Sequence, residues 1–176
     1  MCARFRSVAA VALISSLLLL TACTAGPRDI RVTSVTDVNL RDQTQFEWAA
    51  GPPPYRSKMI SRIDFTTSTD LLAFAKEHDF NVSFVVGPCE KGEVKDNGAG
   101  LGAVYWGKTH IYFGTKDAPG YAEAIAKGPP FTYQAYAERL EVDAAHGPLC
   151  FALAGGAMFG GKLRSNVATI PPKPSN

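Results

Sequence analysis

Long apolar runs and net charge are both scarce in this sequence. The apolar run from Val8 to Leu20 has 13 residues, whereas a helix that crosses a bilayer needs about 20. The formal net charge is only +2 over 176 residues, and Arg4 and Arg6 near the N-terminus supply that excess. The sequence therefore predicts no retained membrane-spanning helix and no basic surface for nucleic acid.

The motifs of common catalytic classes are also missing. The three histidines, His78, His110 and His146, are 32 and 36 residues apart, which matches no local metal-ligand spacing. There is no Gly-x-Ser-x-Gly turn and no Cys-x-x-Cys redox pair. The alternating glycines from Gly98 to Gly102 lack the strand and helix that flank a dinucleotide-binding turn. We therefore expect no catalytic residue, no metal and no cofactor.

Residues 20–23 read Leu-Thr-Ala-Cys and end the apolar run, and Arg4 and Arg6 form a basic segment before it. This order of basic, apolar and small residues before a cysteine resembles the lipobox signal peptide of bacterial lipoproteins. The resemblance covers residues 1–23 only. It implies cleavage before Cys23, whose thiol then carries a diacylglyceryl group. An ordinary signal peptide cut nearby is the alternative.

A lipid on Cys23 implies attachment to a membrane of the bacterial cell envelope. The residue after it is Thr24 and not aspartate, which in lipoproteins of Gram-negative bacteria favours the outer membrane, facing the periplasm. Removing residues 1–22 leaves 154 residues with 16 basic and 16 acidic side chains. A neutral body argues against adhesion to anionic lipid, so we expect the acyl chains to supply the attachment.

Cysteine usage agrees with export. Cys2 leaves with the signal and Cys23 is lipidated, so Cys89 and Cys150 remain. An even pair in an oxidising compartment predicts a disulfide. In the chain-entropy model, closing a loop of about 60 residues stabilises a protein by about 4 kcal/mol. Two buried free thiols are the alternative.

Three consecutive prolines after Gly51 cannot donate to a sheet ladder and suggest a boundary at residue 54. We expect residues 23–54 to form a lipidated tether and arm, with an edge strand from Ile30 to Leu40. Residues 55–170 are expected to form the compact domain, and residues 171–176 a disordered tail.

Within the domain, alternating apolar residues predict strands, and capping residues predict two short helices that begin near Asp70 and Asp117. The segment from Phe131 to Val142 fits a strand or a helix equally well. Short turns between neighbouring strand runs favour antiparallel pairing. The predicted fold is α+β, with a mostly antiparallel sheet of about six or seven strands, two short helices and one disulfide.

The candidate binding surface combines an acidic loop with aromatic residues. The segment from residue 90 to 100 is polar and contains an Asp-Asn-Gly turn signal, so we predict a surface loop whose base the disulfide fixes. One predicted hairpin carries two pairs of adjacent aromatic residues, Tyr105-Trp106 and Tyr112-Phe113. Adjacent strand residues point to opposite faces, so one aromatic face lies outside the core or under a helix. The alternative is a simple connecting loop with aromatic residues in the core. The predicted surface consists of Glu90, Glu93, Asp96, Tyr105 and Trp106.

These features favour a non-enzymatic lipoprotein that binds another protein of the envelope, of the inhibitor or immunity type. Two alternatives stay open. One is a structural accessory of an envelope or secretion assembly, and the other is a cell-wall hydrolase, because a site made of carboxylates alone leaves little trace in one sequence. An enzyme needs titratable groups that converge in one pocket, whereas an inhibitor presents a protruding loop or an aromatic patch.

Overall fold

The computed structural model describes residues 24–46, 58–96, 98–116, 118–140, 147–157 and 161–172. The predicted signal peptide, Cys23 and the proline-rich boundary at 51–54 lie outside these residues, as do residues 173–176 of the predicted tail. Among the residues that are described, no helix has the length and apolar character needed to cross a membrane.

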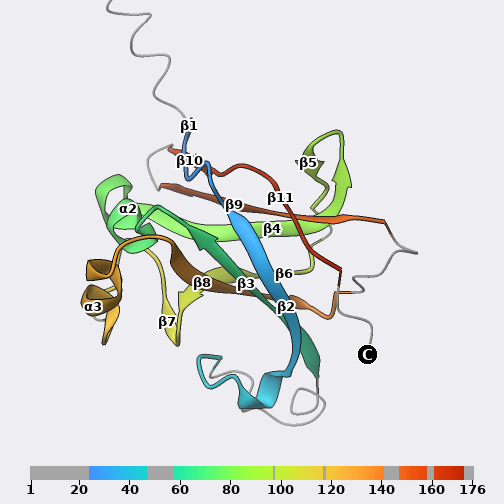
Figure 1. The fold of residues 1–176 in the computed structure, drawn as a ribbon, viewed down its shortest axis with the longest axis horizontal. Coiled ribbons are helices and arrows are strands. Elements are labelled where there is room, and N and C mark those ends of the chain that lie inside the picture. The colour runs from blue at the N-terminus through green and yellow to red at the C-terminus, as the bar shows by residue number, and fades with distance from the viewer. Residues whose placement is uncertain are drawn as a thin grey trace, which may run out of the picture.

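The strands form two sheets that cross each other (Figure 1). The first has the order β1-β10-β9-β4-β5, with β11 also paired to β9, and the second has the order β2-β3-β8-β6-β7. Every pairing is antiparallel except that of β1 with β10. The bounds are β1 (Thr24–Ala25), β2 (Arg31–Asn39), β3 (Met59–Thr67), β4 (Phe80–Glu90), β5 (Glu93–Val94), β6 (Gly100–Trp106), β7 (Thr109–His110), β8 (Phe131–Glu138), β9 (Leu149–Ala157), β10 (Lys162–Arg164) and β11 (Ala168–Thr169).

Two α-helices, α2 (Leu71–His78) and α3 (Tyr121–Ala126), lie together at one end of the sheets (Figure 1). Asp70 begins α2, because its carboxylate accepts the amides of Leu72 and Ala73 at 3.1 and 3.0 Å. A short 3₁₀ helix, η1 (Leu40–Asp42), follows β2. The ambiguous segment beginning at Phe131 forms a strand, β8.

The mostly antiparallel pairing, the two helices and the disulfide are confirmed. The predicted number of strands is wrong, because eleven strands are labelled in the described residues and they form two sheets. Four of them, β1, β5, β7 and β11, are only two residues long. A two-residue strand is too short to show an alternating pattern, so periodicity does not reveal it.

The described part of the expected arm is paired and packed against the domain. Strand β2 is an edge strand, as predicted, but it pairs with β3 from Arg31 to Asn39 with one bulge near Thr33. Leu40 and Phe46, which follow it, are buried. Residues 24–46 therefore belong to the folded body, since their apolar side chains complete its packing.

The two sheets are joined along both open sides. On one side, the Ser83 hydroxyl of β4 donates to the Gly102 carbonyl of β6 at 2.5 Å. On the other, the Asn166 side chain accepts the amide of Ile30 at 2.8 Å and donates to the carbonyl of Ile30 at 3.0 Å. The Asn166 side chain thus satisfies the backbone amide and carbonyl of Ile30, just before β2, as a neighbouring strand would.

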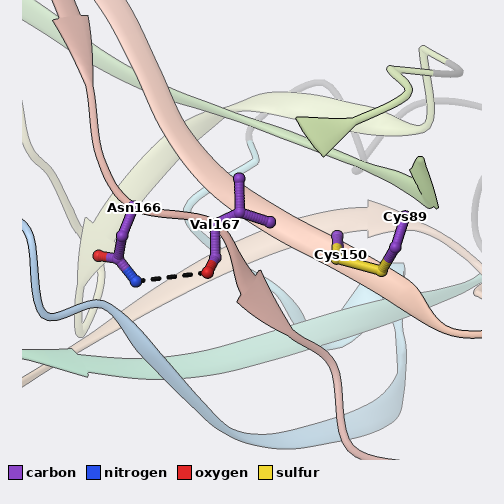
Figure 2. Close-up of a disulfide and its surroundings, with 4 residues drawn as sticks. All are labelled: Cys89, Cys150, Asn166 and Val167. Carbon is purple, nitrogen blue, oxygen red and sulfur yellow. Dashed lines mark hydrogen bonds between the residues drawn. A yellow bond between two sulfur atoms is a disulfide. The ribbon is translucent and has the colours of Figure 1, made fainter. Parts of the chain in front are cut away.

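The disulfide joins the end of β4 to β9. Cys89 and Cys150 have Cα atoms 5.1 Å apart, and the Cys89 amide donates to the Pro148 carbonyl at 3.1 Å. Figure 2 shows the bridge between β4 and β9, with Asn166 on the segment that connects β10 to β11. The first half of the chain is therefore tied covalently to the last strands.

Two separate apolar clusters stabilise this arrangement. The central core lies between the sheets and includes Phe65 from β3, Phe84 from β4 and Phe151 from β9. The ring of Phe151 lies 5.0 Å from that of Phe65 and 5.5 Å from that of Phe84, measured between centroids. The outer cluster covers part of the second sheet's other face, and its buried members are Leu40, Phe46, Ile60, Tyr105 and Tyr136.

Candidate binding surface

The predicted acidic loop begins as a tight hairpin. Glu90 and Glu93 are register partners at the end of β4 and β5, and the Cys89–Cys150 disulfide lies beside their base. Glu90 pairs with Lys95 at 3.0 Å, and the side chains of both are more than half exposed. Asp96 accepts the Gly98 amide at 2.9 Å in a local turn. These carboxylates are accessible, but a neighbouring lysine offsets Glu90, so the hairpin is only weakly acidic.

Tyr105 and Trp106 lie on opposite faces of β6, as successive strand residues do. Tyr105 is 8% exposed and packs edge-on against Phe46 at 5.5 Å in the outer cluster. Trp106 faces the central core and packs edge-on against Tyr121 of α3 at 5.1 Å. Tyr105 is therefore buried in the outer cluster, whereas Trp106 is partly buried against the central core.

The structure does not bring the hairpin and these two residues together. Figure 1 shows β5 and β7 at opposite ends of the molecule, and Tyr105 pairs with His110 of β7. The predicted surface therefore divides into an acidic hairpin at one end and an aromatic region at the other.

A continuous row of rings leads from Tyr105 to solvent. The Tyr105 ring lies 5.6 Å from His110, His110 lies 4.9 Å from Tyr112, and Tyr112 lies 5.7 Å from Phe113. We call these four residues the aromatic row. Phe113 ends it and is 38% exposed. The sequence indicates Tyr112 and Phe113 as aromatic candidates, whereas His110 enters there only as a possible metal ligand. The spacing of two residues between His110 and Tyr112 is the signal that places both rings on one face.

The aromatic row is held rigidly and carries little charge. Tyr112 bridges to Asn81 of β4, and the Phe113 amide donates to the Phe80 carbonyl at 3.1 Å. Partial burial of its ring lowers the pKa of His110, which favours the neutral imidazole. Burial, with the neighbouring Tyr136, raises the pKa of Tyr105. The row therefore presents neutral rings, suited to apolar or aromatic side chains of a partner.

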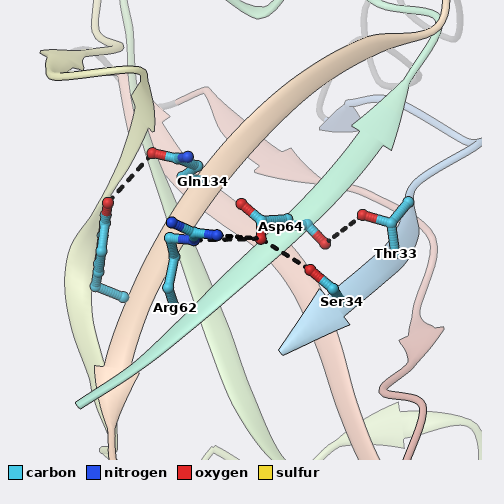
Figure 3. Close-up of polar contacts among 6 residues, drawn as sticks. Thr33, Ser34, Arg62, Asp64 and Gln134 are labelled. Carbon is cyan, nitrogen blue, oxygen red and sulfur yellow. Dashed lines mark hydrogen bonds and ion pairs between the residues drawn. The ribbon is translucent and has the colours of Figure 1, made fainter. Parts of the chain in front are cut away.

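A polar cluster continues from the outer cluster across the same face (Figure 3). Asp64 accepts hydrogen bonds from Ser34 at 2.8 Å and from Arg62 at 3.2 Å. Gln134 accepts from the hydroxyl of Tyr136 at 3.2 Å. The side chains of Arg62 and Asp64 are 33% and 14% exposed. Because Arg62 and Asp64 compensate each other's charge, the cluster orders this sheet face and supplies no unpaired charge to a ligand.

A buried tyrosine pair connects the two helices to β8. Tyr121 donates to Asp70 at 2.6 Å, its hydroxyl lies 2.8 Å from that of Tyr133, and Tyr133 accepts the Leu71 amide at 3.0 Å. Burial raises the pKa of Tyr133 to about 12. Burial, and then the bond to Asp70, raises the pKa of Tyr121 further. Both hydroxyls stay protonated at neutral pH and serve the packing of α2.

In the part of the chain that the structure describes, no three His, Cys, Asp or Glu side chains gather closely enough to hold a metal ion. His78 packs beside Phe74 at 4.6 Å between ring centroids, and His146 lies outside the described residues. Comparison with known proteins found no match to this chain among family models, curated proteins or solved structures.

Proposed function

We propose that this protein is a lipid-anchored protein of the bacterial envelope whose folded domain binds another protein without catalysing a reaction. The aromatic row carries the binding part of the proposal. It combines an exposed phenylalanine with a backbone fixed to the neighbouring strand. Such residues are common anchors of protein interfaces, where burial of a single aromatic side chain contributes about 2 kcal/mol or more.

Rigidity supports this assignment. The hydrogen bond from Phe113 to Phe80 and the bridge from Tyr112 to Asn81 fix the turn to β4. The Thr115 hydroxyl donates to the His110 carbonyl at 2.7 Å and accepts the Tyr112 amide at 3.2 Å. A preformed turn loses little conformational entropy on binding, so more of the contact energy remains as affinity.

The envelope location is supported by the lipobox-like residues 20–23 and by the Cys89–Cys150 disulfide. A disulfide between strands is typical of exported domains, because the cytosol keeps thiols reduced. Lipidation at Cys23 would make the attachment stable, since two or more acyl chains hold a protein at a membrane far more strongly than one.

Photo-crosslinking in intact cells tests the binding surface. A photoreactive phenylalanine replaces Phe113 in one variant and Met59 in a matched control, because Met59 is 39% exposed and Phe113 is 38% exposed. We expect a discrete protein adduct from position 113 and none from position 59. Mass spectrometry then identifies the partner in the adduct.

Affinity measurements with that partner separate the aromatic row from the acidic hairpin. Phe113→Ser is expected to weaken binding at least tenfold, and Met59→Ser to leave it unchanged. Reversing the charges of Glu90, Glu93 and Asp96 tests the hairpin separately. Equal adducts at positions 113 and 59, or unchanged affinity of Phe113→Ser, would contradict the aromatic row as the binding surface.

A further inference from the structure

The folded body begins directly after the expected lipidation site. Strand β1 starts at Thr24, the residue after Cys23, and pairs with β10 so that Thr24 lies opposite Lys162 and Ala25 opposite Leu163. The backbone at Gly26 runs so close to Arg164 that an added Cβ would lie 2.1 Å from its carbonyl oxygen. The start of the expected tether is therefore part of the sheet.

The next residues are fixed as well. Pro27 is buried, and its carbonyl accepts the Asn166 amide at 3.2 Å. Asn166 also holds Ile30 through its side chain. A lipid on Cys23 would therefore hold the β1–β10 edge against the membrane, because no free chain separates the two.

Three exposed basic side chains surround this edge: Arg28, Lys162 and Arg164. Lys162 and Arg164 flank the buried Leu163 on β10, so they point to the same outward face. None of the ion pairs among the described residues involves any of the three.

Few acidic residues oppose this charge. No acidic residue follows Asp143 in the sequence, so β9, β10 and β11 carry none. Asp29, beside Arg28, accepts hydrogen bonds from the Thr67 hydroxyl and the Ser68 amide, both at 2.6 Å. These neutral donors leave its carboxylate charged, so it offsets one of the three basic side chains. The mature chain has no net charge as a whole, which argues against adhesion to anionic lipid. Its charges are unevenly distributed, however, and the β1–β10 edge carries a local excess of positive charge.

We propose that the β1–β10 edge rests on anionic phospholipid headgroups through Arg28, Lys162 and Arg164, and thereby orients the domain on the membrane. This inference rests on the proposed lipid anchor. Each basic residue near an anionic surface strengthens binding about fivefold. Three are too few to retain a soluble protein, but the anchor supplies a high effective concentration. In this orientation η1, on the opposite side of the sheets from β1, faces away from the bilayer (Figure 1).

Amine footprinting tests the contact on the lipidated full chain. The protein is reconstituted into phosphatidylcholine vesicles with or without phosphatidylglycerol, and floated protein is treated with acetic anhydride. We expect acetylation of Lys162 to slow about fivefold in the anionic vesicles, whereas Lys91 in the hairpin and Lys127 after α3 react equally in both. Mass spectrometry measures each rate.

Two double variants that both retain Lys162 are compared, and the acetylation rate of Lys162 is measured in each. Arg28→Gln with Arg164→Gln is expected to remove most of the protection of Lys162, and Lys91→Gln with Lys95→Gln is expected to preserve it. Protein that does not float with vesicles overturns the anchor and this inference together. Protein that floats but reacts equally at Lys162 in both vesicle types overturns this inference alone.

Discussion

The central core and the outer cluster use similar side chains in different surroundings. The core places Phe65, Phe84 and Phe151 between two sheets. The outer cluster places Phe46 over Tyr105 and Tyr136 on one sheet face, and the segment after η1 covers them. An enclosed cluster leaves a cavity when a ring is removed, whereas a cluster near the surface can admit water or collapse. We therefore expect the loss in free energy of unfolding on removal of an aromatic ring to depend on how fully the ring is enclosed, and not only on its aromatic contacts.

The largest effect is expected from Phe151→Ala. Its ring contacts Phe65 and Phe84 and is fully buried, so its loss combines the transfer term with an enclosed cavity. We expect the free energy of unfolding to fall by about 3 to 5 kcal/mol, measured by urea denaturation with the disulfide intact. A loss below about 1 kcal/mol would mean that the two sheets close around the cavity.

The second-largest loss in the free energy of unfolding is expected when the disulfide is removed. Replacing Cys89 and Cys150 together by alanine removes a cross-link between residues 61 apart in sequence. We expect a loss of about 2 to 4 kcal/mol in the free energy of unfolding. Because the bridge joins β4 to β9, both strands of the first sheet should lose amide protection in hydrogen exchange more than β2 and β3 of the second. Uniform loss across both sheets would contradict this local effect.

Phe46→Ala separates the outer cluster from the core. Phe46 is 5% exposed, and within the described residues no second sheet lies above it, so we expect mainly the transfer term to be lost. We expect a decrease of about 2 kcal/mol in the free energy of unfolding, about half of that for Phe151→Ala. The near-ultraviolet circular dichroism of Tyr105 and Tyr136 should change in the same variant. Equal losses for the two phenylalanine variants would remove the distinction between the clusters.

Local patterns predicted the parts of the fold that local chemistry determines. The alternation of Phe80, Val82, Phe84 and Val86 places all four inside the core, and Asp70 begins α2. Long-range features have no such signal. Asn166 bonds to Ile30 across 136 residues, and no pattern near either residue indicates that contact. The second sheet and the short strands at the seams were missed for the same reason.

The sequence indicates which residue types could form a binding surface, but it does not indicate which of them lie together in space. Glu90, Glu93 and Asp96 are exposed, but Tyr105 and Trp106 pack in different clusters, because adjacent strand residues face opposite ways. The aromatic row depends on His110 and on a bridge between β4 and the turn after β7. Sequence identifies which aromatic residues are present, whereas strand pairing decides which of them meet.

The smallest effect at neutral pH is expected from Tyr133→Phe, which tests the polar centre of the core. Removing the hydroxyl deprives the Leu71 amide of its acceptor, and we expect a loss of about 1 kcal/mol in the free energy of unfolding. Tyr112→Phe, on the half-buried turn outside the core, is the matched control and should cost less.

Alkaline pH gives the sharper readout of the same tyrosine. Burial raises the pKa of Tyr133 from 10 to about 12 in the folded protein, so folding favours the protonated hydroxyl. The stability from this group is complete below pH 10 and is lost as pH rises from 10 to about 12. Urea denaturation across that range should show a shallower decline for Tyr133→Phe than for the wild type. Parallel declines for the two proteins would show that Tyr133 does not govern the alkaline transition, and that its hydroxyl is ionised no less readily in the folded chain than in the unfolded one.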